Sequence, residues 1–251
     1  MSGHSKWSKI KRQKGAADAK RGQLFTKLAR EIQIAVRDGG GDPNMNFRLR
    51  LAIDHAKQAN LPKDNIERAI LRGTGELKGE VIEEISYEGY GPDGTALIVE
   101  VVTNNRNRSV SEVRRTFDRH GGNLGETGCV AWLFERKGYI GIVPSDGEVE
   151  DLALMAIDAG ADDVKIDEDF VEVYTKMEDL QKVKNVLAQA DVEIDSAELS
   201  WVPKSTVQLD AKSTVQNMRL IDELEELDDV QQVYSNLEID DAVLAAYEED
   251  S

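Results

Sequence analysis

The sequence is poor in the features that mark secreted, membrane-embedded or disulfide-bonded proteins. Cys129 is its only cysteine, which excludes an internal disulfide and a CxxC metal site. No apolar stretch approaches the roughly 18 residues that a membrane-spanning helix requires, and the basic N-terminus lacks the apolar segment of a secretory signal. We therefore expect a soluble, cytoplasmic protein with no membrane partner.

The side chains that carry enzymatic chemistry are also scarce or badly placed for it. The three histidines, His4, His55 and His120, lie far apart and show no metal-ligand or catalytic-triad spacing. Cys129 lies in the apolar run 129–134, which favours a small buried side chain over a nucleophile. The sequence thus predicts no catalytic residue, no cofactor, no metal site and no small-molecule substrate.

Acidic side chains are abundant, and they raise the alternative of a two-metal site. Such a site needs carboxylates that converge within about 4 Å, whereas the densest acidic run, 222–229, alternates with apolar residues on an amphipathic helix. We interpret these carboxylates as a solvated helix face. The competing hypothesis is a metal-dependent nuclease or phosphodiesterase, which would require turnover that a chelator abolishes.

Charge is divided at one point of the chain. Residues 1–73 hold 16 of the 31 basic side chains and only 7 of the 48 acidic ones, a net charge of +9, whereas residues 74–251 carry −26. Lysine and arginine that neutralise phosphates release counterions and so bind a polyanion regardless of its sequence. The acidic remainder would repel the same partner and orient its approach. This division predicts that the N-terminal region binds nucleic acid.

Helical periodicity dominates the first 74 residues. Apolar side chains repeat on one face from Leu24 to Val36, and three consecutive glycines from Gly39 end that helix. Pro62 suits the first turn of a later helix, which should stop before Gly73. We expect three short helices that pack as a small bundle, over residues 24–38, 46–58 and 62–72.

Strand patterns replace the helical ones from about residue 81. The segment 89–94 matches G-x-G-x-x-G, but a strand follows it, which indicates a hairpin turn rather than a dinucleotide site. Ser109 and Glu112 form a capping box for a helix that Gly121 ends. The elements expected here are strands over 81–87, 96–102 and 130–134 and a helix over 109–120.

A second succession of strands and helices follows. Between residues 139 and 199 the order is strand, helix, strand, strand, helix, strand, which is the ferredoxin-like order. A helix over 213–227 and a strand over 230–234 then remain without a sheet of their own, so we expect them to return to the earlier strands. The ferredoxin-like unit would then be an insertion. The acidic tail after Asp240 is expected to fray.

Basic side chains gather on two predicted surfaces. The first is a mobile arm over residues 2–14, followed by the outward face of the first helix; Trp7 in this arm can stack on a base or pack on the bundle. The second is a stripe of guanidinium groups, which suit phosphate, on the 109–120 helix, with an ordinary solvated face as the alternative. The predicted nucleic-acid contacts are Lys6, Lys9, Lys11, Arg12, Lys14, Lys20, Arg21, Lys27, Arg30, Arg106, Arg108, Arg115 and Arg119.

Long, specific stretches identify a family resemblance. They are 3–7 (GHSKW), 18–22 (DAKRG), 25–28 (FTKL), 39–43 (GGGDP), 62–70 (PKDNIERAI), 87–92 (YEGYGP), 105–108 (NRNR), 121–125 (GGNLG) and 130–132 (VAW). On these residues the chain resembles the YebC/PmpR family, whose mitochondrial relatives are translational activators of cytochrome oxidase subunit one. The resemblance is densest up to about residue 138.

The resemblance implies a multidomain α+β protein without enzymatic activity. It implies an N-terminal three-helix bundle, an α+β middle domain, and a ferredoxin-like βαββαβ domain inserted in the middle domain. The expected domains are 1–74, 75–136 together with 205–251, and 137–204. Because family members are described as DNA-binding transcriptional regulators and others as ribosome-associated factors, we expect a DNA-binding regulator of gene expression. The alternative is a translation factor that binds ribosomal RNA and the ribosome, and the acidic ferredoxin-like domain could itself bind a basic partner protein.

Overall fold

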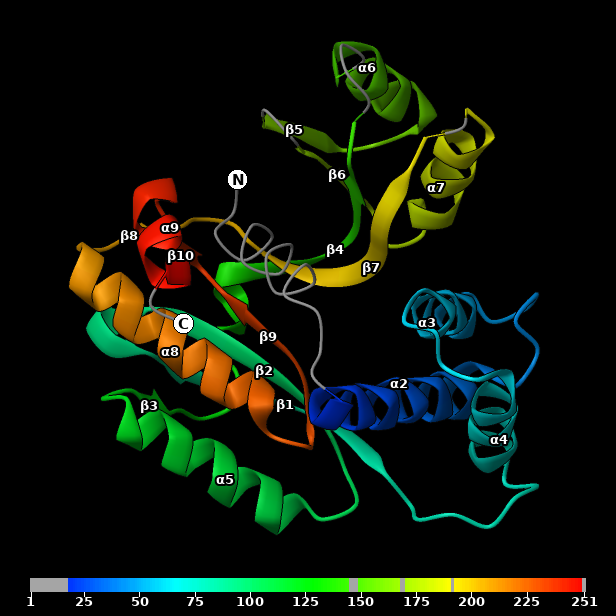
Figure 1. Cartoon of the computed structure of the whole chain (residues 1–251), viewed down its shortest axis with the longest axis horizontal. Helices are drawn as coiled ribbons and strands as arrows, with labels where there is room; N and C mark the ends of the chain where they lie inside the picture. Colours follow the sequence, from blue (N-terminus) through cyan, green and yellow to red (C-terminus); the bar gives the residue numbers. More distant parts are fainter. Residues whose placement is uncertain (1–17, 145–148, 168–169, 191, 250–251) are drawn as a thin grey trace. The chain divides into compact units, whose positions relative to one another are not determined.

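The computed structural model describes residues 18–144, 149–167, 170–190 and 192–249 (Figure 1). The chain divides into two compact units, of which the first is formed by residues 134–204. The second unit joins the described residues before 134 to those from 205 onward. The molecule is mixed α+β, as predicted. Within the described ranges, no helix is both long and apolar enough to cross a membrane. The separation of a 1–74 domain from a middle domain stays a prediction.

Three helices open the second unit and pack around one apolar core. They are α2 (Asp18–Gly39), α3 (Phe47–Gln58) and α4 (Lys63–Thr74). The Asn46 side chain starts α3, because its Oδ1 accepts a hydrogen bond from the Leu49 amide at 3.0 Å. Its Nδ2 donates to the Ala35 carbonyl at 2.6 Å and so ties α3 to α2. The buried core contains Leu28, Ile32, Val36, Leu49, Ala52, Ala56, Ile66 and Ala69.

The helix α4 runs through the glycine at which it was predicted to stop. It ends at Thr74, and the following Gly75 adopts a φ of 83°, a left-handed conformation that glycine tolerates. Gly73 lies inside the helix because α2 passes close to it: a Cβ at Gly73 would lie 2.7 Å from Cβ of Val36. The glycine therefore permits a close contact between the two helices instead of ending one of them.

The larger sheet in the described part of the second unit has four strands. They are β1 (Glu83–Tyr90), β2 (Ala96–Thr103), β3 (Asn123–Leu124) and β9 (Val230–Ser235), in the spatial order β3-β1-β2-β9. The strands β1 and β2 form the predicted hairpin, joined by the short turn Pro92–Gly94. β9 pairs antiparallel with β2, which confirms that the chain returns to the earlier strands after residue 204.

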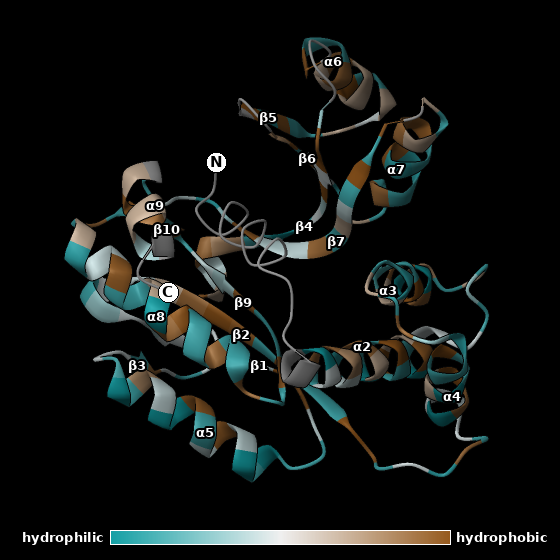
Figure 2. Ribbon diagram, in the orientation of Figure 1, coloured by the Kyte–Doolittle hydropathy of each residue, from teal (hydrophilic) through white to brown (hydrophobic). Residues whose placement is uncertain are grey.

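Helices cover both faces of β2, which Figure 2 shows as apolar over most of its length. On one face, Leu97, Val99 and Val101 pack against side chains of α5 (Arg106–Arg119) and α8 (Ala211–Glu226). On the other face, Val102 packs with Ile34 of α2 and with Ile82. Ile34 thus joins α2 to the sheet through a small buried cluster that is separate from the core of α2–α4 and from the core beneath α5 and α8.

The predicted capping box is wrong, because α5 begins three residues earlier. Asn105 caps the helix, and its Oδ1 accepts from the Arg108 amide at 3.1 Å. Ser109 lies inside the helix and is buried, where its hydroxyl donates to Oδ2 of Asp229 at 2.7 Å. The predicted end is confirmed: α5 stops before Gly121, which has a φ of 78°.

The predicted strand over 130–134 is also wrong. Residues Ala131–Leu133 form a short 3-10 turn, and a strand begins only at Phe134. The buried carboxylate of Glu88 explains the turn, because it accepts hydrogen bonds from the amides of Gly128, Val130 and Ala131 at 2.7–2.8 Å. Backbone donors that converge on one side chain cannot also form a strand ladder.

Residues 134–204 form the ferredoxin-like unit. Its elements are β4 (Phe134–Ile142), α6 (Val149–Ala159), β5 (Asp163–Asp167), β6 (Phe170–Thr175), α7 (Leu180–Gln189) and β7 (Ile194–Pro203). The sheet has the order β5-β6-β4-β7, and each neighbouring pair is antiparallel. The predicted βαββαβ order is confirmed.

The C-terminal segment is more ordered than predicted. The strands β8 (Val207–Gln208) and β10 (Leu237–Glu238) pair in parallel, and a further helix, α9, spans Asp241–Glu249. Leu244 and Tyr247 of α9 are buried, and the Tyr247 hydroxyl donates to Oδ2 of Asp222 at 2.8 Å. The segment after Asp240 was expected to fray. Its described residues instead form a helix that packs against α8 through Leu244 and Tyr247.

Candidate nucleic-acid interface

The basic arm lies outside the described residues. This applies to Trp7 and to the predicted contacts Lys6, Lys9, Lys11, Arg12 and Lys14. The backbone of Lys20 belongs to the first turn of α2. The geometry that follows therefore concerns the remaining cations of α2 and those of α4 and α5.

Two of the predicted contacts on α2 are bonded to the acidic segment 222–229, which covers the end of α8 and the connection to β9. Nζ of Lys27 donates to the carbonyl of Glu225 at 2.6 Å, and Arg30 donates to the carbonyl of Asp228 at 2.8 Å. The carbonyl groups at the end of α8 carry partial negative charge and attract cations. The predicted outward face of α2 therefore contacts the molecule's own acidic segment. Arg21 is exposed and lies 5.8 Å from the ring centre of Phe25.

The stripe on α5 is partly neutralised in the same way. Arg108 forms an ion pair with Asp229 at 2.7 Å, and Arg119 forms one with Glu223. The hydrogen bond and the charge of Asp229 raise the pKa of Arg108. Arg106 and Arg115 are exposed and form no ion pair with a carboxylate in the described part of the chain. Two of the four predicted arginines on this surface thus remain available to an external anion.

Asp229 is the centre of this internal network. Its carboxylate is 3% exposed and accepts from Arg30 at 3.0 Å and from Arg108 at 2.7 Å. The hydroxyls of Ser109 and Thr103 also donate to it, at 2.7 and 2.9 Å. Burial acts to raise the pKa of Asp229, but the hydrogen bonds outweigh it and hold the pKa below the ordinary aspartate value. The carboxylate therefore stays ionised and joins α2, β2 and α5.

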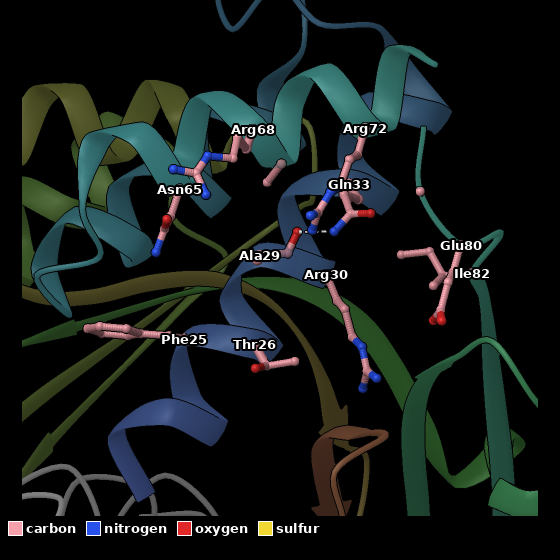
Figure 3. A pocket seen from close by; sticks show the side chains of 12 residues that line it. Phe25, Thr26, Ala29, Arg30, Gln33, Asn65, Arg68, Arg72, Glu80 and Ile82 are labelled. Carbon is pink, nitrogen blue, oxygen red and sulfur yellow. Dashed lines mark hydrogen bonds between the residues drawn. The ribbon is translucent and has the colours of Figure 1, made fainter. Parts of the chain in front are cut away.

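A hollow of about 540 Å³ lies between α2, α4 and the segment before β1 (Figure 3). The α4 wall is formed by Asn65, Arg68 and Arg72, which share one helical stripe because they are three and seven residues apart. The remaining lining residues are Phe25, Thr26, Ala29, Arg30, Gln33, Ala69, Gly79, Glu80 and Ile82.

The two arginines of the α4 wall were missing from the predicted contacts. Arg68 and Arg72 are both exposed, and neither pairs with a carboxylate in the described ranges. Their spacing in the sequence was a usable signal, of the same kind that singled out the stripe on α5. No pattern in the sequence predicted the hollow itself, because α2 and the segment 79–82 complete its walls and meet α4 only in the folded chain.

Guanidinium and amide groups face the hollow, and they donate hydrogen bonds to anions. In the described part of the chain, no group of three or more His, Cys, Asp or Glu side chains is arranged to hold a metal ion. Cys129 is half-buried, and burial, reinforced by the carboxylate of Glu88, raises the pKa of its thiol.

Two family models match most of the sequence. One, described as the TACO1/YebC protein N-terminal domain, matches residues 5–76, and one described as the TACO1/YebC second and third domain matches residues 82–237. The chain belongs to the TACO1/YebC family. The resemblance inferred from the sequence is thereby confirmed.

Curated relatives of similar length share about half of the residues of this TACO1/YebC member. A probable transcriptional regulatory protein of Dehalococcoides mccartyi is 54% identical over 247 residues, 98% of each chain. One of Pelotomaculum thermopropionicum is 55% identical over 243 residues, 96% of this chain and 100% of the relative. The crystal structure of a conserved hypothetical protein from Aquifex aeolicus matches with a TM-score of 0.83 and 52% identity, over 89% of this chain and 93% of that one.

Proposed function

We propose that this chain is a non-enzymatic, cytoplasmic regulator of gene expression that binds DNA through its phosphates. The observation that carries the proposal is the separation of charge, +9 over residues 1–73 and −26 over the rest. The names of the curated relatives, probable transcriptional regulatory proteins, support the same class of function.

The proposed contacts are predicted cations of the arm, which lie outside the described residues, and predicted cations of α2 and α5. They comprise the arm residues Lys6, Lys9, Lys11, Arg12 and Lys14, with Lys20 of α2 and the exposed arginines Arg21, Arg106 and Arg115 of α2 and α5. The remaining predicted cations, Lys27, Arg30, Arg108 and Arg119, are bonded internally and fix the helices that carry the contacts. Phosphate contacts give affinity and orientation without reading sequence.

The test is the affinity for a fixed DNA duplex over a series of salt concentrations. The logarithm of the association constant should fall linearly with the logarithm of the salt concentration, by about 0.9 for each phosphate contact. Replacing Lys9, Lys11, Arg12 and Lys14 together by glutamine should flatten the slope by up to about 4. The pair Arg106→Gln and Arg115→Gln should flatten it by up to about 2.

The matched control is Arg219→Gln, which removes an exposed arginine of α8. Its slope should equal that of the unsubstituted protein. Affinity that is independent of salt, or a slope that the arm variant leaves unchanged, contradicts the proposal. If the protein bound ribosomes or ribosomal RNA but not duplex DNA, the proposed role in transcription would give way to the alternative role in translation.

A further inference from the structure

The hollow between α2 and α4 has a volume typical of sites that bind one small ligand. Its volume of about 540 Å³ lies within the roughly 300–1,000 Å³ of small-ligand sites. A base inside a duplex is stacked on its neighbours and reaches such a site only if it is unpaired or turned out of the helix. The hollow therefore suits a single nucleotide rather than a double-stranded segment.

The positive charge in the hollow comes mainly from α4. The Arg30 guanidinium pairs with Asp229, with Nη1 at 3.0 Å from Oδ1, although it shares this carboxylate with Arg108. The carboxylate of Glu80 accepts a hydrogen bond from the side chain of Asn104. Arg68 and Arg72 remain as exposed guanidinium groups without a carboxylate partner among the described residues. Such groups bind phosphate oxygens with two parallel hydrogen bonds.

The opposite wall offers an aromatic ring and amide groups. Phe25 of α2 is half-buried, and Figure 3 shows its ring at the edge of the space below Asn65 and Arg68. Bases stack on such rings whatever their identity. Gln33 also lines the hollow, and its Nε2 donates to the Ala29 carbonyl at 3.2 Å. Aromatic, amide and guanidinium groups thus line one hollow.

We propose that this hollow binds one unpaired nucleotide of a nucleic-acid chain. Arg68 and Arg72 hold its phosphate, Phe25 stacks on its base, and the amides of Asn65 and Gln33 meet the edge of the base. The inference rests on the proposed function and adds a preference for nucleic acid that contains an unpaired nucleotide. A free nucleotide has the same chemistry, and the experiment separates the two sources.

The experiment uses 2-aminopurine, a base whose fluorescence falls on stacking, in three probes. They are the free 2-aminopurine nucleoside monophosphate, a single-stranded 12-mer that carries one 2-aminopurine, and the same 12-mer paired into a duplex. We expect the full-length protein to bind the single strand at least ten times more tightly than the duplex, with the fluorescence quenched. The free nucleotide should bind more weakly than the single strand.

Two variants assign the effect to the hollow. Phe25→Leu keeps an apolar side chain but removes the stacking surface, and it should weaken single-strand binding about 5- to 100-fold and abolish the quenching. Arg68→Gln with Arg72→Gln should flatten the salt dependence of single-strand binding by up to about 2. Arg219→Gln is again the control, and circular dichroism and urea denaturation confirm that each variant is folded.

The possible outcomes separate this inference from the proposed function. If the hollow variants bound the single strand with the same affinity as Arg219→Gln, the inference would be overturned. Duplex binding that still depended on salt would leave the proposed function standing. Free nucleotide bound as tightly as the single strand would overturn the assignment to a chain segment and make the hollow an effector site. Absence of binding to every nucleic acid at low salt would refute the proposed function itself.

Discussion

Replacement of Asp229 by asparagine should be among the most damaging conservative changes in the second unit. Asparagine keeps the shape of the side chain but removes the charge and directs an N–H group toward donors. The carboxylate has four donors on three elements: Arg30 on α2, Thr103 on β2, and Arg108 and Ser109 on α5. Loss of the carboxylate therefore affects α2, β2 and α5 together.

The magnitude follows from the burial of each partner. The two hydroxyl bonds contribute about 1 kcal/mol each, and the bond to the mostly buried Arg30 about 1.5–3 kcal/mol. The Arg108 side chain is 44% exposed, so solvent screening limits its pair to below about 1 kcal/mol. We expect Asp229→Asn to lower the free energy of unfolding by about 3–5 kcal/mol at pH 7, the range measured when one partner of a buried pair is removed.

The measurement is urea denaturation followed by circular dichroism, with Asp118→Asn as the control. Asp118 is an exposed residue of α5, and its substitution should change the stability by less than about 0.5 kcal/mol. A loss below about 1 kcal/mol in Asp229→Asn at pH 7 would refute the view that the network joins these elements.

The pH dependence gives an independent check. The folded state lowers the pKa of Asp229, so its contribution to stability is complete above the unfolded value of about 3.9 and is lost as pH falls through the folded value. The difference between the unsubstituted protein and Asp229→Asn should therefore narrow as the pH falls below about 4. A difference that stays constant down to pH 2 would contradict the assignment.

Two further predictions concern packing and reactivity. Gly73→Ala should destabilise the protein by about 1–2 kcal/mol, because the new Cβ would lie 2.7 Å from Val36 and overpacking outweighs the gain in helix propensity. The control is Gly22→Ala, which has no atom within 4 Å of the new Cβ and should stabilise α2 slightly. Both stabilities are measured by urea denaturation. If Gly73→Ala were the more stable of the two variants, the close contact would be disproved. Cys129, whose pKa burial raises, should react with iodoacetamide at pH 7.5 more slowly than free cysteine, and an equal rate would show that the thiol is neither buried nor shifted.

Local periodicity was sufficient to predict most helices and strands. The helix α3 begins one residue after the predicted start and ends at the predicted residue, and the ferredoxin-like order is as expected. The errors arose where a distant group competes with the local pattern. The strand expected at 130–134 is replaced by a turn because the carboxylate of Glu88, more than 40 residues earlier, takes its backbone donors.

The candidate site was predicted less completely than the fold. The sequence located Arg30 and Arg108 as cations on outward helix faces, but it contained no sign that Asp229 would lie between them. It also left Arg68 and Arg72 unassigned, although their spacing places both on one face of α4. Charge counts identify where cations are numerous, whereas ion pairing depends on which residues meet in space.

The amino-acid sequence by itself determined the separation of charge, the family, and the succession of elements, because these depend on composition and on contacts between residues close in the chain. The tertiary structure decided which cations are available to a partner and where a hollow can form. Asp229 is 199 residues from Arg30, and such a pair exists only once α2 and the α8–β9 connection have packed on the same sheet. Which surface cations are paired therefore depends on which residues lie close in space, and the order of residues along the chain does not state this directly.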